Sequence, residues 1–323
     1  MQHSFRVIGA GVWGLAFSDY LIKKGCKVDI FCRDVSLSSN KLNKFKFHPS
    51  LLGYIKPIST LSDYNCNESI NIIAVNSNGF SELFDTHEKY FDGLKKVVWL
   101  TKGLDHKTGE LFSEYLQEKY AKIELALLSG PSFAEDLYRG LDISISLASN
   151  SQRFSDQLYE LISSKALQLR PTSHLQAIEI ASCLKNITAI LCGVSDNLFS
   201  ENKSDLLIKI ACNEVISMYC SLNNIHDNNL NDVIINSPGC IGDMNLTCKQ
   251  EKSRNYQFGR LITDESLSIS NALTDIGTVE GYECCKTLIE KSKVLKSTVA
   301  RTLYNILSKP AKRSNYIQDL LQA

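Results

Sequence analysis

Short apolar runs alternate with helix-like patterns through the first half of the chain. Strand-like runs are expected at 5–8, 27–32, 70–75, 97–100, 125–128 and 143–147. Apolar residues at helical spacing lie between them, near 12–24, 79–90, 109–120 and 151–163. A regular alternation of strand and helix is typical of a doubly wound, largely parallel sheet. We therefore predict an α/β fold for this half of the chain.

The pattern changes near Pro171, where the strand signals fade. Apolar residues then recur at helical spacing over 174–194 and 205–222, and further helical patterns follow near 279–292 and 294–308. The polar stretches 223–232 and 250–254 are typical of loops. We predict two domains, with the doubly wound sheet in residues 1–170 and an all-helical domain in residues 171–323.

Composition and charge narrow the class of protein. Of 323 residues, 44% are hydrophobic and 22% are charged, and 35 basic residues balance 35 acidic ones. This balance argues against nucleic acid or an anionic membrane as a partner, so an anion site has to be local. Glycines interrupt the apolar core that a signal peptide would need near the start. No apolar run is expected to be long enough to span a membrane, since the longest candidate, 187–194, is flanked by Lys185 and Asp196.

The 11 cysteines are scattered, and no two of them have the C-x-x-C spacing. We therefore expect neither a metal site nor a redox motif. Cys26, Cys183 and Cys192 lie in apolar stretches, where a free thiol behaves as a small hydrophobic group. Free thiols are typical of the reducing cytoplasm, which is the compartment we expect.

Residues 7–14 read Val-Ile-Gly-Ala-Gly-Val-Trp-Gly, directly after the first predicted strand and at the start of a predicted helix. In such a position Gly9 allows a tight turn, Gly11 lets the backbone approach a pyrophosphate, and Gly14 lets helix and strand pack closely. The first N–H groups of the helix attract the same anion. The motif favours a dinucleotide site of the Rossmann type, and a plain strand–turn–helix is the alternative. The expected cofactor contacts here are Gly9, Gly11, Val12, Trp13 and Gly14.

Arg33 and Asp34 follow the second predicted strand. They stand about 20 residues beyond the glycines, where dinucleotide enzymes contact the adenosine ribose. An acidic residue there binds the 2′-hydroxyl of NAD(H), whereas an arginine accommodates the 2′-phosphate of NADP(H). Arg33 favours NADP(H), and Asp34 leaves NAD(H) open.

Four charged residues are candidates for chemistry. Lys185 lies inside an apolar helical pattern, where an ammonium is disfavoured unless it is paired and is suited to acid–base work. The alternative is a lysine whose stem covers apolar surface and whose head reaches water. Lys102 follows a strand where ligands bind, or is solvated. Arg254, before an expected helix from Gln257, either binds a phosphate or lies at the surface. Asp243 either pairs with a buried lysine or begins a turn.

Taken together and in this order, seven blocks resemble the NAD(P)-dependent glycerol-3-phosphate dehydrogenases of the bacterial type over nearly the whole chain. The blocks are Val-Ile-Gly-Ala-Gly-Val-Trp-Gly (7–14), Thr-Lys-Gly-Leu (101–104), Leu-Ser-Gly-Pro-Ser-Phe-Ala (128–134), Leu-Lys-Asn (184–186), Gly-Asp (242–243) with Leu-Thr-Cys (246–248), Ser-Arg-Asn (253–255) with Phe-Gly (258–259), and Val-Glu-Gly (279–281). The set is far more specific than any one block. It favours the functional alternative for Lys185, Lys102 and Arg254.

The resemblance implies a Rossmann domain that binds NAD(P) and a helical domain that binds substrate. It implies that Lys185 is the acid–base lysine at the C2 oxygen. The implied substrate contacts are Lys102, Gly130, Ser132, Asn186, Asp243, Thr247, Ser253, Arg254 and Asn255. The implied cofactor contacts, besides the glycine motif, are Arg33, Lys102, Ala134, Arg254 and Glu280. A homodimer that supplies glycerol phosphate for phospholipid synthesis is also implied.

The sequence departs from the family's pattern at several places. Asn76-Ser77-Asn78 replaces Pro-Ser-His, and residues 197–201 replace a glycine-rich segment before Asn202. Ser204 and Tyr256 stand where arginines are usual, and the 35–60 connection is short. These differences affect the expected substrate affinity and cofactor preference. They leave every proton-transfer candidate in place.

The hypothesis is hydride transfer between NAD(P)H and C2 of dihydroxyacetone phosphate, which gives sn-glycerol 3-phosphate. Lys185 would donate the proton, Asp243 would hold the lysine, and Arg254 would anchor the phosphate. One alternative is another two-domain dehydrogenase acting on a hydroxy acid, although Arg254 and Asn255 indicate a phosphate. The other is an inactive dinucleotide-binding scaffold, which the altered segments 76–78 and 197–204 motivate.

Overall fold

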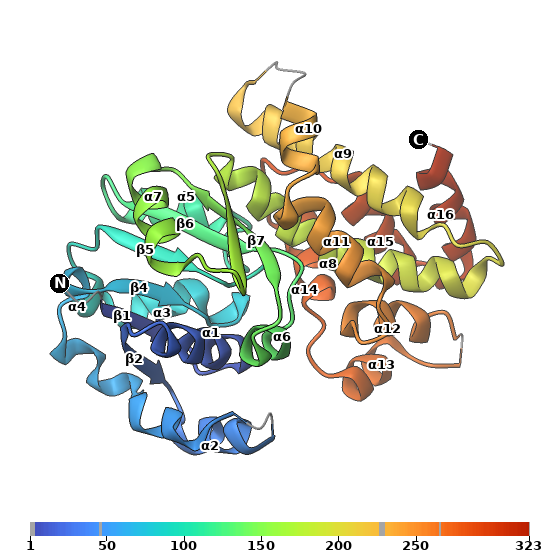
Figure 1. Cartoon of the computed structure of the whole chain (residues 1–323). Coiled ribbons are helices and arrows are strands. Elements are labelled where there is room, and N and C mark those ends of the chain that lie inside the picture. Colours follow the sequence, from blue (N-terminus) through green and yellow to red (C-terminus); the bar gives the residue numbers. More distant parts are fainter. Residues whose placement is uncertain (1–3, 45–46, 226–229, 265, 323) are drawn as a thin grey trace. The chain divides into compact units, whose positions relative to one another are not determined.

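The computed structural model describes residues 4–44, 47–225, 230–264 and 266–322 (Figure 1). The chain divides into two compact units. The sheet unit comprises Met1–Lys102 and Phe112–Leu175, and the helical unit comprises Gly103–Leu111 and Gln176–Ala323. The chain therefore passes from one unit to the other three times, whereas the predicted boundary at residue 171 implies a single passage.

The sheet unit contains an eight-stranded sheet in the order β3-β2-β1-β4-β5-β6-β7-β8. Neighbouring strands are parallel except β6 and β7, which are antiparallel. This confirms the predicted α/β class with a largely parallel, doubly wound sheet. The strands are β1 (Ser4–Ile8), β2 (Lys27–Cys32), β3 (Ile55–Pro57), β4 (Ile70–Ile73), β5 (Lys96–Trp99), β6 (Glu124–Ser129), β7 (Ile143–Ser149) and β8 (Leu167–Thr172).

The two edge strands, β3 and β8, were not predicted. β3 is three residues long and ends in Pro57, so it carries no readable alternation. In β8, Leu167 and Leu169 are buried, but Pro171 falls in the same strand and hides it from pattern reading. Proline is tolerated there because β8 is an edge strand. Because Pro171 marks the end of the strand pattern in the sequence, the predicted domain boundary cuts through β8.

Helices cover both faces of the sheet. Val98 of β5 belongs to a core with Leu15 and Phe154, whereas its neighbour Trp99 packs against Phe80, with 6.4 Å between ring centroids. Opposite side-chain directions at successive positions are what a strand imposes. The helices are α1 (Val12–Lys23), α2 (Val35–Lys44), α3 (Phe80–Thr86), α4 (Glu88–Phe91), α5 (Phe112–Lys119), α6 (Ala134–Arg139) and α7 (Gln152–Ile162). Figure 1 shows α1 and α6 side by side, and they are in contact.

In the helical unit every element of the described residues is helical, as predicted. The elements are α8 (Leu175–Leu198), α9 (Ser204–Asn223), α10 (Leu230–Ile235), a π-helical turn (Pro238–Gly242), α11 (Asp243–Lys249), α12 (Arg254–Leu261), α13 (Ile269–Ile276), α14 (Glu280–Glu290), α15 (Thr298–Ser308) and α16 (Arg313–Gln322). The predicted loop 223–232 is too long at both ends, because α9 reaches Asn223 and α10 begins at Leu230. Its residues 226–229 lie outside the described part of the chain.

Helix α8 corrects one expectation from the sequence. It has an 18-residue window of mean hydropathy 1.5, so by length and composition alone it could cross a membrane. That window is entirely buried in the protein, as is usual for a core helix. The apolar pattern therefore reflects burial of the helix on all sides. The sequence expectation rested on the charged residues that flank 187–194, and so it underestimated the length of the apolar helix.

Glycines let two helices approach α8 closely. A Cβ atom at Gly193 would lie 2.1 Å from the carbonyl oxygen of Tyr256, and one at Gly259 would lie 2.1 Å from that of Ile190. A Cβ atom at Gly281 would lie 2.5 Å from the carbonyl oxygen of Asn186. These distances are shorter than carbon and oxygen atoms tolerate, so only glycine fits. Helices α12 and α14 are thereby held against the helix that carries Lys185.

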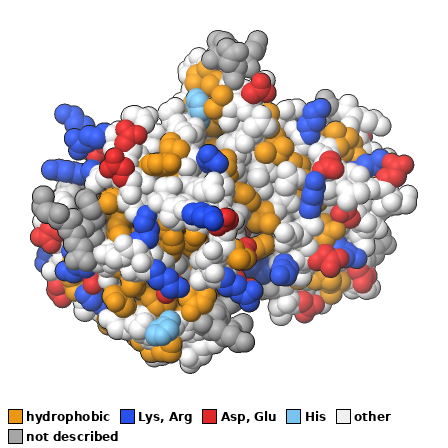
Figure 2. Space-filling model, in the orientation of Figure 1, with side chains coloured by type: hydrophobic (Ala, Val, Ile, Leu, Met, Phe, Trp, Pro, Cys, Tyr) orange, Lys and Arg blue, Asp and Glu red, His pale blue; other side chains and the backbone are white. Residues whose placement is uncertain are grey.

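The face shown in Figure 2 carries Lys and Arg side chains interspersed with Asp and Glu side chains and with scattered hydrophobic ones. This is the surface expected from 35 basic and 35 acidic residues. Charges of both signs are mixed on that face, so binding of an anion there would depend on individual side chains.

Candidate active site

The glycine motif lines a cleft at the carboxyl ends of β1, β2 and β4. Gly9 has φ of +119°, and a Cβ atom there would lie 2.5 Å from the carbonyl oxygen of Ala74. At Gly14 a Cβ atom would lie 2.0 Å from the carbonyl oxygen of Gly9. Gly11 differs, because the nearest protein atom to a Cβ atom there is 3.9 Å away. The fold therefore requires the first and third glycines, whereas the second leaves room for a ligand.

The cleft has a volume of about 360 Å³. Its start is the N-terminus of α1, where Gly11 provides no side-chain cap, so the first N–H groups keep their capacity for an anion. Arg33 and Asp34 lie along the same cleft. A helix start without a side-chain cap, an open glycine and a charged pair at the end of β2 fit the dinucleotide that the sequence predicts. Val12 and Trp13 are half-buried at the start of α1 and are not among the residues that line this cleft.

One wall of the cleft was missed from the sequence. It is formed by α3 and the residues directly before and after it, together with Ile58. The residues of this segment are 79, 82, 83, 86 and 87. This spacing is a helical stripe after a strand, and it could have been read as such. Burial lowers the pKa of His87, so its ring is neutral at neutral pH. Asn76, one of the departures from the family's pattern, also lines the cleft, and its side chain accepts from the N–H of Gly79 at 3.0 Å.

The other predicted residues of the sheet unit follow β5 and β6. Lys102 is half-buried and ends the first segment of the unit. A Cβ atom at Gly130 would lie 2.8 Å from the Cα atom of Ile145, so packing of the sheet requires this glycine. The buried Ser132 donates to the carbonyl oxygen of Gly130 at 3.1 Å. Ala134 is the buried first residue of α6.

Lys185 and Asp243 form a buried ion pair. The Nζ atom of Lys185 on α8 lies 2.7 Å from Oδ2 of Asp243, and the side chains are 3% and 2% exposed. The alternative of a lysine whose head reaches water is therefore wrong. Asp243 begins α11 directly after the π-helical turn, and Thr247 in the same helix donates its hydroxyl to the Asp243 carbonyl oxygen at 2.7 Å. The structure brings these three predicted residues together.

A chain of amides joins three more predicted residues. Asn186 Nδ2 donates to Glu280 Oε2 at 3.1 Å, and Asn255 Nδ2 donates to Asn186 Oδ1 at 3.0 Å. The N–H of Gly281 donates to Asn255 Oδ1 at 2.9 Å. Because each amide has its partners, the direction in which Asn186 and Asn255 present their remaining donors is defined. This network links α8, α12 and the start of α14.

Helix α12 begins at Arg254, and not at Gln257 as predicted. The side chain of Ser253 caps it by accepting from the N–H of Tyr256 at 3.4 Å. The pattern was misread because a polar stretch precedes the helix and Arg254 is exposed. Arg254 and Asn255 are thus the first two residues of a helix, whose N–H groups have no partner within the helix.

Two departures from the family's pattern meet at one carboxylate. Tyr256 Oη donates to Asp196 Oδ2 at 2.8 Å, and Ser204 Oγ lies 3.3 Å from both carboxylate oxygens. A third altered residue, Asn197, donates to the hydroxyl of Thr263 at 2.5 Å. Nothing in the sequence indicated that residues 196, 204 and 256 meet.

Among the described residues, no group of three or more His, Cys, Asp or Glu side chains is placed to hold a metal ion. The cysteines are free thiols.

Comparison with known proteins covers both halves of the chain. Residues 4–155 match the profile of the NAD-dependent glycerol-3-phosphate dehydrogenase N-terminus, and residues 174–318 match that of the C-terminus. A glycerol-3-phosphate dehydrogenase [NAD(P)+] of Legionella pneumophila is 30% identical over 86% of this chain and 84% of its own length. That of Francisella tularensis subsp. novicida is 27% identical over 99% of this chain and 98% of its own length.

Solved structures show the same fold. The crystal structure of glycerol-3-phosphate dehydrogenase from Coxiella burnetii superposes with a TM-score of 0.82 at 24% identity, over 100% of this chain and 99% of that one. The enzyme from Saccharomyces cerevisiae gives a TM-score of 0.81 at 17% identity, over 100% of both chains.

Proposed function

The chain belongs to the family of NAD-dependent glycerol-3-phosphate dehydrogenases, and we propose that Lys185 is the residue that transfers the proton in its reaction. The enzyme interconverts dihydroxyacetone phosphate and sn-glycerol 3-phosphate with NAD(P)(H) as cofactor. Membership of this family argues against the hydroxy-acid dehydrogenase and the inactive scaffold. The single observation that carries the role of Lys185 is its buried pairing with Asp243.

When bound, the nicotinamide supplies a hydride to C2 of dihydroxyacetone phosphate or accepts one from sn-glycerol 3-phosphate. Negative charge then develops on the C2 oxygen. Lys185 stabilises that charge with its ammonium and gives the oxygen a proton. Asp243 pairs with the ammonium and fixes its position, and Thr247 steadies the first turn of α11 that carries Asp243.

The phosphate end of the substrate is bound by Arg254 and by the free N–H groups of Arg254 and Asn255. A guanidinium fork and the positive end of a helix both favour a phosphate. Ser253 supports this turn as its cap. The amide network keeps Asn186 and Asn255 oriented toward substrate. Lys102, Gly130 and Ser132 complete the proposed substrate contacts.

The cleft of the sheet unit binds the cofactor. Gly9, Gly11 and Gly14, with Val12 and Trp13, form the pyrophosphate cradle, and Arg33 favours the 2′-phosphate of NADP(H) while Asp34 permits NAD(H). Further cofactor contacts are proposed for Lys102, Ala134, Arg254 and Glu280. The sheet unit is thus the cofactor-binding domain and the helical unit the substrate-binding domain.

The enzyme acts as a homodimer in the cytoplasm. Free thiols support the reducing cytoplasm as its compartment. Its product is the backbone for phospholipid synthesis.

Replacement of Lys185 tests the proposal. In Lys185→Ala, turnover should fall by about 10²–10⁴-fold because the general acid is lost, while the Kd of NADPH, followed by its fluorescence, stays unchanged. Since the variant removes one charge of a buried pair, the double variant Lys185→Met/Asp243→Asn removes both charges and keeps the volume. Turnover close to that of the wild type in either folded variant would contradict the role of Lys185.

A further inference from the structure

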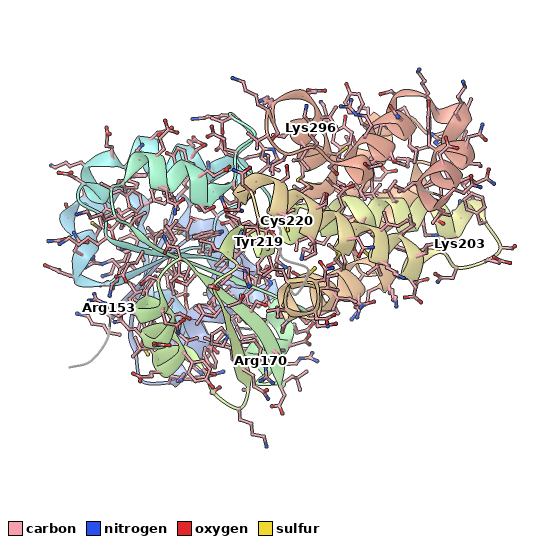
Figure 3. The ribbon with its side chains drawn as sticks, turned by 90° about the horizontal axis from the view of Figure 1, so that it is seen from above. Arg153, Arg170, Lys203, Tyr219, Cys220 and Lys296 are labelled. Atoms are coloured by element: carbon pink, nitrogen blue, oxygen red, sulfur yellow. The ribbon has the colours of Figure 1, made fainter. Side chains whose placement is uncertain are left out.

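One carboxylate joins three helices of the helical unit. Asp196 lies near the end of α8, the helix that carries Lys185. It accepts from Tyr256 Oη of α12 at 2.8 Å and from Ser204 Oγ, the first residue of α9, at 3.3 Å. The connection from α8 to α9 ends at Lys203, which is labelled in Figure 3 and directly precedes Ser204. Asp196 thus links α12 and α9 to the helix of the proton-transfer residue.

Helix α12 depends on such contacts for its orientation. It is eight residues long, and a helix of this length has little stability of its own. Three contacts hold it on α8: the close approach at Gly193 and Gly259, the Asn255–Asn186 amide bond, and the Tyr256–Asp196 bond. Of these, the Tyr256–Asp196 bond is the one made by a first-turn side chain outside the proposed substrate contacts.

Tyr256 stands on the same turn as Arg254. Its ring is buried and its backbone N–H is bound by the Ser253 cap at 3.4 Å. A displacement of Tyr256 therefore moves the turn that presents Arg254 and the two free N–H groups. A charge-assisted bond from its hydroxyl to Asp196 restrains that displacement more strongly than the packing of the ring alone.

We propose that Tyr256 is a positioning residue for the phosphate end of the substrate: its bond to Asp196 holds the first turn of α12, and with it Arg254, at a defined distance from Lys185. The inference rests on the proposed function, in which Arg254 binds the phosphate. It assigns a role to one of the positions where the chain departs from its family, and it identifies Asp196 as the partner.

The hydroxyl of Tyr256 keeps its proton at neutral pH. Burial, followed by the hydrogen bond to Asp196 and the charge of Asp196, raises the pKa of Tyr256 to about 12. The hydroxyl therefore stays protonated and donates at neutral pH. Ser204 provides a second donor to the same carboxylate, so Asp196 remains held when either partner is removed.

The decisive comparison is between substrates with and without a phosphate. In Tyr256→Phe, kcat/KM for dihydroxyacetone phosphate should fall about tenfold, mainly through KM, because a hydrogen bond to a charged group is lost. With dihydroxyacetone, which lacks the phosphate, kcat/KM should not change. The KM of NADPH should also stay unchanged. A merely structural role would affect both substrates alike.

Two further variants test the partner. Asp196→Asn keeps an oxygen that accepts from Tyr256 and should have the smaller effect, whereas Asp196→Ala should reproduce the loss seen in Tyr256→Phe. The double variant Tyr256→Phe/Asp196→Ala should lose no more than either single variant, because the two residues act through one bond. Additive losses would contradict the proposed pairing.

Tyr304→Phe is the matched control. Tyr304 on α15 also donates to a carboxylate, that of Glu290 on α14, at 3.3 Å, but neither residue adjoins a proposed contact. It should leave kcat/KM unchanged with both substrates. Equal loss on both substrates in Tyr256→Phe, or no loss on either, would overturn the inference.

Arg254→Ala separates the two proposals. If it lowers kcat/KM for dihydroxyacetone phosphate and not for dihydroxyacetone, while Tyr256→Phe has no effect, only the positioning role fails. If Arg254→Ala affects both substrates equally, the phosphate site itself is wrongly assigned.

Discussion

At the scale of single residues, the ion pair of Lys185 and Asp243 is buried and carries the proposed chemistry. Both charges are removed from water, which costs free energy, and their attraction at 2.7 Å offsets part of that cost. In the proposed role, Lys185 would transfer its proton in a position that is shielded from solvent. Arg33 is the opposite case, since it is exposed, and its proposed contact with the cofactor would depend on charge and hydrogen bonds.

The cost of separating the pair is a prediction of its own. Asp243→Ala removes the carboxylate that pairs with the buried ammonium and should lower the free energy of unfolding by about 3–5 kcal/mol. Asp243→Asn, which keeps an oxygen near the ammonium, should lower it by less. Urea denaturation of both variants checks this order, and equal losses would show that the charge of Asp243 is unimportant for stability.

Arg33 predicts the effect of the cofactor's 2′-phosphate. In Arg33→Ala, kcat/KM for NADPH should fall about tenfold or more, because a charge-assisted contact is lost, while kcat/KM for NADH should hardly change. Steady-state kinetics with the two cofactors measure the ratio. The same loss with both cofactors would place Arg33 away from the 2′ position.

At the scale of elements, the site depends on how closely helices approach α8. Its glycine neighbours bring α12 and α14 to distances that no side chain would permit. The same approach lets Asn186 reach both Asn255 and Glu280. Elsewhere in the helical unit, Glu214 of α9 accepts from the N–H groups of Thr298 and Val299, at 2.8 and 3.1 Å, and so caps α15.

Gly281 tests the helix approach. In Gly281→Ala the new methyl group would lie 2.5 Å from the Asn186 carbonyl oxygen. Such overpacking should cost about 1–3 kcal/mol of unfolding free energy and weaken activity by moving Asn186. Gly53→Ala is the control, since nothing lies within 4 Å of a Cβ atom there. A Gly281 variant as stable and active as the wild type would contradict the tight approach.

Glu214 predicts a dependence of stability on pH. Burial raises the pKa of its carboxyl, although bonds from Ser297, Thr298 and Val299 oppose this. Between the ordinary glutamate pKa and the raised value, the folded protein holds the proton more tightly than the unfolded chain does. Stability from this group is therefore greatest below about pH 4.3 and falls as pH rises through the raised pKa.

The measurement compares the wild type with Glu214→Gln, which does not titrate. Urea denaturation over a series of pH values gives the difference in unfolding free energy at each pH. The wild type should lose stability relative to the variant as pH rises through this window. If the wild type instead gained stability relative to Glu214→Gln as pH rises, the ionised carboxylate would be the favoured form in the folded protein.

At the scale of the whole molecule, one short segment does not follow the order of the chain. Residues 103–111 leave the sheet unit and pack with the helical unit, where Leu104 and Leu111 enter its core. Lys291 Nζ donates to the His106 carbonyl oxygen at 2.6 Å, and a Cβ atom at Gly109 would lie 2.7 Å from the N atom of Ser292. The segment that follows Lys102 is thereby anchored to the end of α14.

The assembly state is a prediction at this scale. Light scattering in solution should give a mass twice the 36.1 kDa of the chain, since a homodimer is proposed. The mass should not change over a tenfold dilution if the dimer is stable. A mass of one chain throughout would contradict the homodimer.

The sequence by itself determined the local features of this protein. Periods of two and of 3.6 residues indicate which side chains turn inward, so six of the strands and the long helices were predicted. The glycines at 9, 11 and 14 predict the dinucleotide site, because the turn that they form depends only on neighbouring residues of the chain. Pattern reading failed where the pattern was short or interrupted, as in β3 and in β8 with its Pro171.

Only the tertiary structure decided which distant residues meet. The sequence leaves two alternatives for Lys185, and only the fold places Asp243 beside it. In the sequence Asp196 is only a charge that flanks an apolar run, and the fold brings Ser204 and Tyr256 to it. Periodicity states that a side chain is buried but not what it is buried against. That depends on how helices cross, which the glycines of α8, α12 and α14 control through contacts between residues far apart in the chain.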